Sequence, residues 1–419
     1  MIYYLVRPVA RYVLSYYYRN IDVSGLENIP QDAPVILAAN HPTGFIEPCI
    51  LACFQPRALH FLARGSVFVN TFYNQLLAAV NILPVFRLED GGYERLKENF
   101  STFEACFRAL SRKQAIMIMA EGRCIHEKAL RPLRKGTARI ALGALDQDAT
   151  LQEVYIVPVG INFTHAAEVR STVMIRCGKP ILASDYLKAY RQGEAAAIKS
   201  LTQHLRSRLS PLVVQFPNRD VADIGESLLA FDRALHPIPQ GITNNGHQLN
   251  RELEIATNTP TEDPPLLRLF NRLKAHKLPI GVLLGQTKKH VKKSRFQWAK
   301  AWLSLLLLLP QLPLWGLGEY IGASRPRHIE FYSPVRFAVI TGGTLLLYPF
   351  ALFLLSWPLK VWLLSSIFLT NWSLRQLESI QWWWQNRKLE RMVAQDRKAL
   401  QELLSAIEKP LAHVSHRIP

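Results

Sequence analysis

Two long uncharged runs of apolar residues restrict what this 419-residue chain can fold into. Residues 301–318 contain no charged side chain, and residues 337–359 form a second run of the same kind. Each run approaches the roughly 20 apolar residues that a helix needs to cross a bilayer. We expect them to form a membrane hairpin within residues 297–372, with buried core helices as the alternative. Pro310 and Pro313 also leave a re-entrant first segment open.

The residues that flank these runs favour the membrane interpretation. Basic residues precede the first run, as expected of a cytosolic flank that faces lipid: Lys288, Lys289, Lys292, Lys293 and Arg295. Tryptophans near the ends of the runs resemble interfacial anchors: Trp298, Trp302, Trp315 and Trp357. The chain carries 50 Lys and Arg against 32 Asp and Glu, a formal net charge of +18, which implies an anionic partner. Because basic residues abut an apolar run, we predict that this partner is anionic membrane lipid and not nucleic acid.

The rest of the chain divides by pattern into further segments. Residues 1–20 are apolar and aromatic but are interrupted by Arg7 and Arg11, so we expect either an interfacial helix or a helix packed on the core. Residues 21–215 show the pattern of a folded domain, and residues 216–296 contain polar turn clusters, such as 241–246, that suggest a helical linker region. Residues 373–419 are predicted to form a charged C-terminal helix.

Short apolar strands alternate with helices in the domain at 21–215. The strand candidates are residues 35–39, 82–86, 115–119 and 155–159, with a further strand and turn in 176–181. Between them, apolar residues recur at helical spacing: Leu96, Phe100, Phe103, Phe107 and Leu110. This alternation predicts an α/β domain with a mixed sheet flanked by helices.

The most informative chemistry follows the first of these strands. Asn40 and His41 end the strand, and Glu47 follows six positions later across a Pro-Thr-Gly turn. A turn of this length allows the carboxylate to reach the imidazole, which would pair a general base with an acid that orients it. A structural histidine remains the alternative for any one of the twelve histidines in the chain.

Charged residues also follow two other predicted strands. Arg87 follows the strand at 82–86, and Glu121, Gly122 and Arg123 follow the strand at 115–119. The two arginines are suited to binding a phosphate, and Gly122 allows close approach of backbone to a ligand. Taken singly, Arg87 fits a surface ion pair equally well, and Glu121 fits a helix-start carboxylate.

In this order, the motifs resemble those of the glycerophospholipid acyltransferases, the family that includes lysophosphatidate and glycerol-3-phosphate acyltransferases. Asn40-His41 with Glu47 is similar to the family's first block, although Glu stands where Asp is usual. Pro84-Val-Phe-Arg87 is similar to the block that ends in a phosphate-binding arginine. Glu121-Gly122 matches a Pro-Glu-Gly block in which Ala120 replaces proline, and Val157-Pro158-Val159 matches the fourth. The resemblance covers roughly residues 20–210.

The resemblance implies a membrane-bound O-acyltransferase of phospholipid biosynthesis. His41, held by Glu47, would be the general base that activates a hydroxyl of glycerol phosphate or a lysophospholipid. Substrate-binding residues would be Arg87, Glu121, Gly122 and Arg123. The acyl donor would be acyl-CoA or acyl carrier protein, a thioester substrate, and the resemblance implies no cofactor and no metal. The catalytic domain would lie on the cytoplasmic face of the membrane.

Two other functions compete with this interpretation. A non-catalytic, membrane-anchored lipid-binding scaffold on a degenerate acyltransferase fold is the alternative, because Glu47 and Ala120 depart from the family pattern. A hydrolase that uses His41 as base is disfavoured, since the sequence contains neither a Gly-x-Ser-x-Gly nucleophile motif nor a His-Glu-x-x-His metal motif.

Overall fold

The computed structural model describes residues 2–68, 70–86, 99–261 and 295–390, together with the single positions 267, 268, 271, 275 and 398. The chain divides into two compact units. The first unit comprises residues 1–213, 241–247 and 317–346, and the second comprises residues 214–240, 248–316 and 347–419. The domain boundaries expected from the sequence, at residues 20, 215, 296 and 372, stay predictions.

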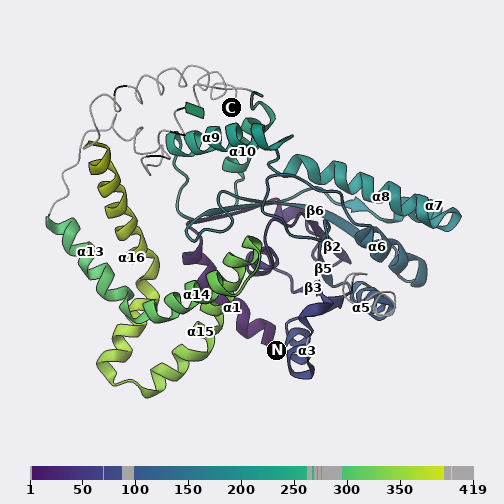
Figure 1. The fold of residues 1–419 in the computed structure, drawn as a ribbon. Helices are drawn as coiled ribbons and strands as arrows, with labels where there is room; N and C mark the ends of the chain where they lie inside the picture. The colour runs from purple at the N-terminus through teal and green to yellow at the C-terminus, as the bar shows by residue number, and fades with distance from the viewer. Residues whose placement is uncertain are drawn as a thin grey trace. The chain divides into compact units, whose positions relative to one another are not determined.

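A mixed sheet forms the centre of the first unit (Figure 1). Within the described residues it has nine strands, in the order β4-β3-β5-β2-β6-β7-β1-β9, with β8 paired to β6. The strands are β1 Asn20–Ser24, β2 Val35–Ala39, β3 Leu59–Arg64, β4 Ile82–Val85, β5 Ala115–Met119, β6 Tyr155–Phe163, β7 Thr172–Cys177, β8 Ile181–Leu182 and β9 Gly241–Thr243. The predicted α/β fold with a mixed sheet is therefore confirmed.

The direction of the strands decides where their ends meet. Strands β4, β3, β5, β2 and β6 are all parallel, so their carboxyl ends lie along one edge of the sheet. β7 is antiparallel to β6, and β1 and β9 run with β7. Ligands of open α/β sheets bind at the carboxyl ends of parallel strands, and β2 lies near the middle of this group.

Three helices cover one face of the sheet: α5 Asn99–Ser111, α6 Gly136–Gln147 and α8 Glu194–Leu209. Alternate residues of β2 and β5, such as Ile36 and Ile116, point into this core and are fully buried. Their neighbours Val35, Leu37 and Ala115 are buried as well, as expected for strands covered on both faces. The expected helix through Phe103 and Leu110 is observed as α5, while Leu96 lies outside the described residues.

Several strands differ from the sequence prediction. β1 and β3 were not expected, and β6 extends to Phe163 instead of ending near residue 159. The predicted strand at 176–181 is two strands, β7 and β8, separated by a turn. Residues 241–243 of the expected polar turn form the edge strand β9, where the Thr243 hydroxyl donates to the buried Asp22 carboxylate on β1 at 2.8 Å. A polar segment becomes a strand here because the sheet offers it backbone partners.

The N-terminal segment is a helix, α1 Ile2–Tyr17, that packs against α2 Ile46–Phe54. The Arg7 guanidinium donates to the Gln55 carbonyl, and the Arg11 guanidinium lies 5.2 Å from the centre of the Phe54 ring. One face of α1 is therefore packed, in agreement with the core-helix alternative. Its exposed residues Tyr4 and Leu5 are compatible with the interfacial role, which stays a prediction.

The C-terminal apolar runs are helical. α13 Arg295–Leu308 continues through a 3-10 turn at 309–311 into α14 Leu312–Ser324, and α15 covers Tyr332–Leu354. By length and composition alone, the segments Gln297–Ser324 and Ile329–Leu354 could each cross a membrane. These two segments overlap the uncharged runs predicted at 301–318 and 337–359, and their ends differ from those of the runs by a few residues.

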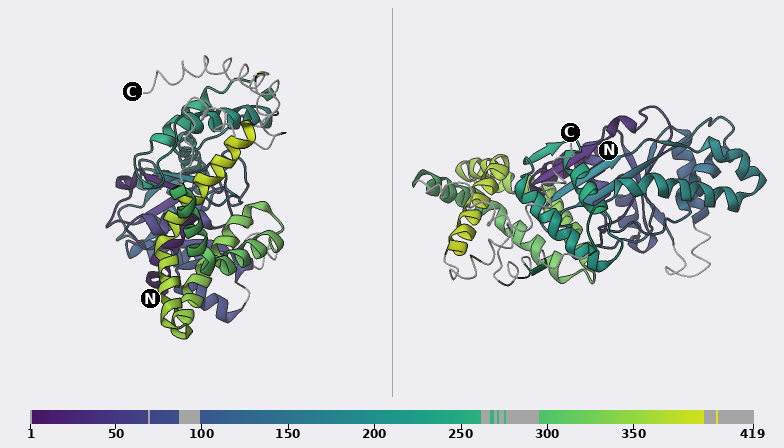
Figure 2. Two further views of the ribbon diagram at one scale, coloured as in Figure 1. Left: turned by 90° about the vertical axis from the view of Figure 1, so that its left-hand side faces the viewer. Right: turned by 90° about the horizontal axis from the view of Figure 1, so that it is seen from above.

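α16 Trp357–Glu390 contains both the short apolar stretch after Lys360 and the first part of the expected charged helix, so these are one helix and not two. In the second unit, α16 lies beside α13 (Figure 1 and Figure 2). The buried Gln311 side chain donates to Ser366 and Thr370 on α16, and the Trp298 and Trp383 rings pack edge to face with centres 5.4 Å apart. The basic residues 288–293 lie outside the described residues.

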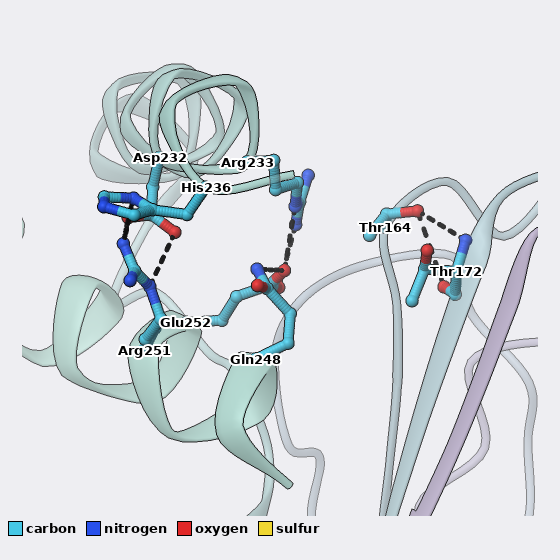
Figure 3. Close-up of polar contacts among 8 residues, drawn as sticks. All are labelled: Thr164, Thr172, Asp232, Arg233, His236, Gln248, Arg251 and Glu252. Atoms are coloured by element: carbon cyan, nitrogen blue, oxygen red, sulfur yellow. Dashed lines mark hydrogen bonds and ion pairs between the residues drawn. The ribbon is translucent and has the colours of Figure 1, made fainter. Parts of the chain in front are cut away.

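The second unit also contains α9 Arg219–Leu235 and α10 His247–Thr257, which are joined by ion pairs (Figure 3). Arg233 makes two hydrogen bonds of 2.8 Å to the fully buried Glu252, which also accepts from Gln248. Arg251 pairs with Asp232. Burial lowers the pKa of Arg233, but the adjacent carboxylates, Glu252 above all, more than offset this and raise it. Helix pairing in this region therefore depends on matched charges.

Candidate active site

The end of β2 is joined to β6 by the side chain of Asn40 as well as by backbone hydrogen bonds. The Asn40 side chain donates to the Ile161 carbonyl on β6 at 2.9 Å and accepts from the Ile161 N–H at 2.7 Å. Asn40 therefore takes the place of a further backbone pair and continues the β2–β6 ladder by one residue. This contact explains why an asparagine precedes His41.

The chain turns after His41 and enters α2, which carries Glu47 in its first turn. The Glu47 carboxylate is fully buried, and its Oε1 lies 3.5 Å from His41 Nδ1. The same oxygen accepts the backbone N–H of Thr43. The additional methylene of Glu, compared with Asp, thus still brings the carboxylate to the imidazole. The predicted proximity of the Glu47 carboxylate to the His41 imidazole is therefore observed, and the catalytic role of the two residues stays a prediction.

Glu121 holds the main chain of His41. β5 ends beside β2, and the backbone N–H of Ala120 donates to the Ala39 carbonyl, so the next residue reaches His41. Glu121 Oε2 accepts the backbone N–H of His41 at 2.6 Å, and Oε1 accepts that of Arg131 at 2.7 Å. The Ile125 N–H in turn donates to the His41 carbonyl at 3.2 Å. Both peptide groups of His41 are therefore bound by the loop that follows β5.

Gly122 has a positive φ of 70°, a conformation that side chains rarely adopt. A Cβ at this position would lie 2.9 Å from Arg134 Cγ, so the stem of Arg134 occupies the space that glycine leaves. Arg134 itself is exposed, and its Nε would lie 3.7 Å from a Cβ at position 122. Arg123 is also exposed on this loop.

The structure describes five of the six predicted site residues. His41, Glu47, Glu121, Gly122 and Arg123 gather at the carboxyl ends of β2 and β5. Arg87 lies outside the described residues, and its predicted contact with phosphate stays a prediction. For Glu121 the structure adds a contact with backbone that the sequence did not suggest.

Two residues of interest, Arg134 and Asn40, lie in motifs noted in the sequence but were not predicted as site residues. Arg134 belongs to the basic stretch Arg131-Pro-Leu-Arg134-Lys-Gly, whose charge was the available signal. Asn40 was noted only as part of a motif, because its partner Ile161 is far away in the sequence.

Residues 20–162 match the model of the Acyltransferase family. A match of 25% identity over 181 residues, 42% of this chain, is to glycerol-3-phosphate O-acyltransferase 2 of Saccharomyces cerevisiae. The glycerol-3-phosphate O-acyltransferase 1 of the same yeast is 30% identical over 115 residues, 27% of this chain.

Among solved structures, the chain is similar to the 1-acyl-sn-glycerophosphate acyltransferase PlsC of Thermotoga maritima. The identity is 17% and the TM-score 0.34, and the match covers 49% of this chain and 81% of that one. The similarity to the Acyltransferase family is thus carried by residues 20–162. The matches span 24% and 15% of the two yeast proteins, about a quarter of their length or less.

Proposed function

We propose that this protein transfers a fatty acyl group from a thioester donor to a hydroxyl of glycerol phosphate or a lysophospholipid, a step of phospholipid synthesis. The observation that carries the proposal is the His41–Glu47 pair at the carboxyl end of β2, within a domain that matches the Acyltransferase family. Acyl-CoA or acyl carrier protein would supply the thioester.

The reaction needs a single base. His41 Nδ1 faces the buried Glu47 carboxylate, which leaves Nε2 to take the proton of the acceptor hydroxyl. The acceptor oxygen then forms a bond to the acyl carbon, and the carbon–sulfur bond breaks. The proton passes from Nε2 to the departing thiolate, so no covalent enzyme intermediate is needed. Glu47 would stabilise the imidazolium that exists between these proton transfers.

Binding of the acceptor phosphate is assigned to arginines at the same sheet edge. Arg123 and Arg134 lie on the loop that holds His41, and Arg87, which is outside the described residues, stays a candidate from the sequence alone. Arginine forms strong, charge-assisted hydrogen bonds to phosphate. We therefore add Arg134 to the predicted phosphate-binding residues.

The negative charge that develops on the acyl oxygen in the transition state would have to be stabilised by donors other than the backbone N–H groups of the turn after β2. The backbone N–H groups of His41, Thr43 and Gly44 already donate to oxygen atoms of Glu121, Glu47 and Glu330, respectively. N–H groups that are already engaged are poor candidates for receiving charge that develops in the transition state.

A screen of donors and acceptors with a mass-spectrometric readout tests the proposal. Purified protein in lipid vesicles would be mixed with acyl-CoA or acylated carrier protein and with glycerol phosphate, lysophosphatidate or other lysophospholipids. We expect at least one pair to give the acylated product with wild-type protein. Lipid binding without product from any pair would favour the scaffold instead.

A further inference from the structure

The short connection between the two apolar segments packs against the turn that carries His41. This connection comprises residues 325–331 and ends in a 3-10 turn at Ile329–Phe331. The backbone N–H of Gly44 donates to the Glu330 carbonyl at 2.9 Å. A Cβ at position 44 would lie 2.6 Å from the Phe331 ring, so the ring fills the space beside this glycine.

The first turns of α15 add two further contacts within the same unit. The Tyr17 hydroxyl on α1 lies 2.9 Å from the hydroxyl of Ser333, which is buried, and the Tyr17 ring packs edge to face on Phe337. Arg336, only 8% exposed, donates to Glu319 on α14 at 2.8 Å and to the Ala167 carbonyl at 3.4 Å. The connection is thus held at the His41 turn, and the start of α15 is held at α1 and at the loop between β6 and β7.

The electrostatics of this region agree with close packing. Burial lowers the pKa of His126, on the loop after β5, and the nearby Glu330 and Glu47 carboxylates act in the opposite direction. The Glu330 and Glu47 carboxylates therefore both lie close enough to the His126 imidazole to influence its charge.

These contacts conflict with a hairpin whose connection lies across the bilayer from the catalytic domain. The hydrocarbon core is about 30 Å thick, whereas the Gly44–Glu330 contact is a direct hydrogen bond. We propose that residues 325–333 lie on the same side of the membrane as His41 and pack against the turn that follows it. In this arrangement Phe331 and Glu330 position the catalytic histidine. The placement is independent of the proposed function, whereas the effect on catalysis rests on it.

Cysteine crosslinking tests the placement without an activity assay. The Cβ of residue 44 would lie 3.3 Å from Phe331 Cγ, which is one bond from Phe331 Cβ. The two Cβ atoms are then at most about 4.8 Å apart, close to the roughly 3.5–4.5 Å of disulfides. The double variant Gly44→Cys/Phe331→Cys would be oxidised in intact membranes. Gly44→Cys/Phe331→Ala/Ile329→Cys is the matched control, because it also removes the ring that a Cβ at residue 44 would meet, and Ile329 is exposed and two positions away.

The native thiols leave a low background for this experiment. The thiols of Cys53, Cys106 and Cys177 are buried, and burial raises their pKa to about 12, so they remain unreactive near neutral pH. The half-buried Cys49 and Cys124 would be replaced by Ala and Ser, respectively.

We expect a disulfide, reversed by reductant, in most molecules of the 44/331 variant and in at least five-fold fewer of the control. As a second probe that keeps Gly44, a photoreactive phenylalanine at position 331 should crosslink to the peptide that contains residues 40–47. If the photoprobe crosslinks only to lipid and no specific disulfide forms, the placement is wrong.

The positioning effect is measured separately by kinetics. Phe331→Ala should lower kcat at least ten-fold while the acceptor KM changes less than two-fold, and Phe331→Leu should restore part of the rate. An unchanged kcat with a positive crosslink would reject positioning but keep the placement. If wild-type protein has no acyltransferase activity, the proposed function fails while the crosslink still decides the placement.

Discussion

Replacement of Glu121 by glutamine separates two roles that this residue could have. In the structure its two carboxylate oxygens accept the backbone N–H groups of His41 and Arg131, at 2.6 and 2.7 Å. Glutamine keeps the shape but presents one acceptor oxygen, so its amide group must face one of the two N–H donors. Glu121→Gln therefore tests whether the residue positions His41 or binds the acceptor, as its sequence motif suggested.

The magnitude follows from the hydrogen bonds that are lost. A hydrogen bond to a charged group contributes about 1.5–3 kcal/mol, so Glu121→Gln should lower the free energy of unfolding by about that amount. Glu121→Ala, which loses both bonds, should cost about 3–6 kcal/mol, and is less suitable for kinetics because typical domains have only about 5–15 kcal/mol to lose. A displacement of His41 by 1 Å could slow turnover by about 10²-fold.

The assay combines steady-state kinetics with urea unfolding. We expect Glu121→Gln to lower kcat by about 10–10²-fold with little change in acceptor KM, since Glu121 holds the backbone of His41, and a displaced base slows the chemical step without removing a contact to the acceptor. Glu127→Gln is the matched control on the same loop: Glu127 forms an exposed ion pair with Arg131, which is worth only about 0–1 kcal/mol. A large rise in acceptor KM at unchanged kcat would refute the positioning role of Glu121.

Three other substitutions probe separate parts of the molecule. Glu47→Gln, which keeps the size of the side chain but loses its charge, should lower kcat by about 10²-fold without unfolding the protein, as steady-state assays and thermal unfolding would show; a rate close to wild type would contradict the pair. Arg134→Gln keeps most of the stem that packs on Gly122 and should raise the KM of a phosphorylated acceptor by about 10–10²-fold, corresponding to about 1.5–3 kcal/mol; an equal rise in donor KM would indicate a structural role. Glu252→Ala leaves Arg233 buried without its main carboxylate partner and should destabilise by about 3–5 kcal/mol in urea unfolding, whereas a loss below 1 kcal/mol would show that water replaces the carboxylate.

The sequence alone was sufficient to predict those parts of the site whose residues are close together in the chain. The spacing of His41 and Glu47 spans one turn and the start of one helix, so their pairing could be predicted from the motif alone. The strands at 35–39 and 115–119 were also predictable, because fully buried parallel strands appear as short continuous apolar runs.

Features that depend on distant partners could not be predicted. The contact of Glu121 with the His41 N–H requires β5 to lie beside β2, a pairing that no local pattern specifies. The strand β9 is polar and short, and forms only because β1 presents a free edge to it. Phe331 packs against Gly44, and these residues come from opposite halves of the sequence. An aromatic residue between two apolar helices does not by itself indicate which distant residue it contacts.

The most direct test of the account is the turnover of His41→Ala with the donor and acceptor that wild-type protein uses. His41 is the proposed base, and Glu47, Glu121 and Asn40 all act by holding it or its strand in place. Loss of a general base typically costs about 10²–10⁴-fold, so kcat should fall by that factor while thermal unfolding and membrane extraction stay unchanged. If folded His41→Ala retains turnover close to that of wild type, the assignment of the base is contradicted.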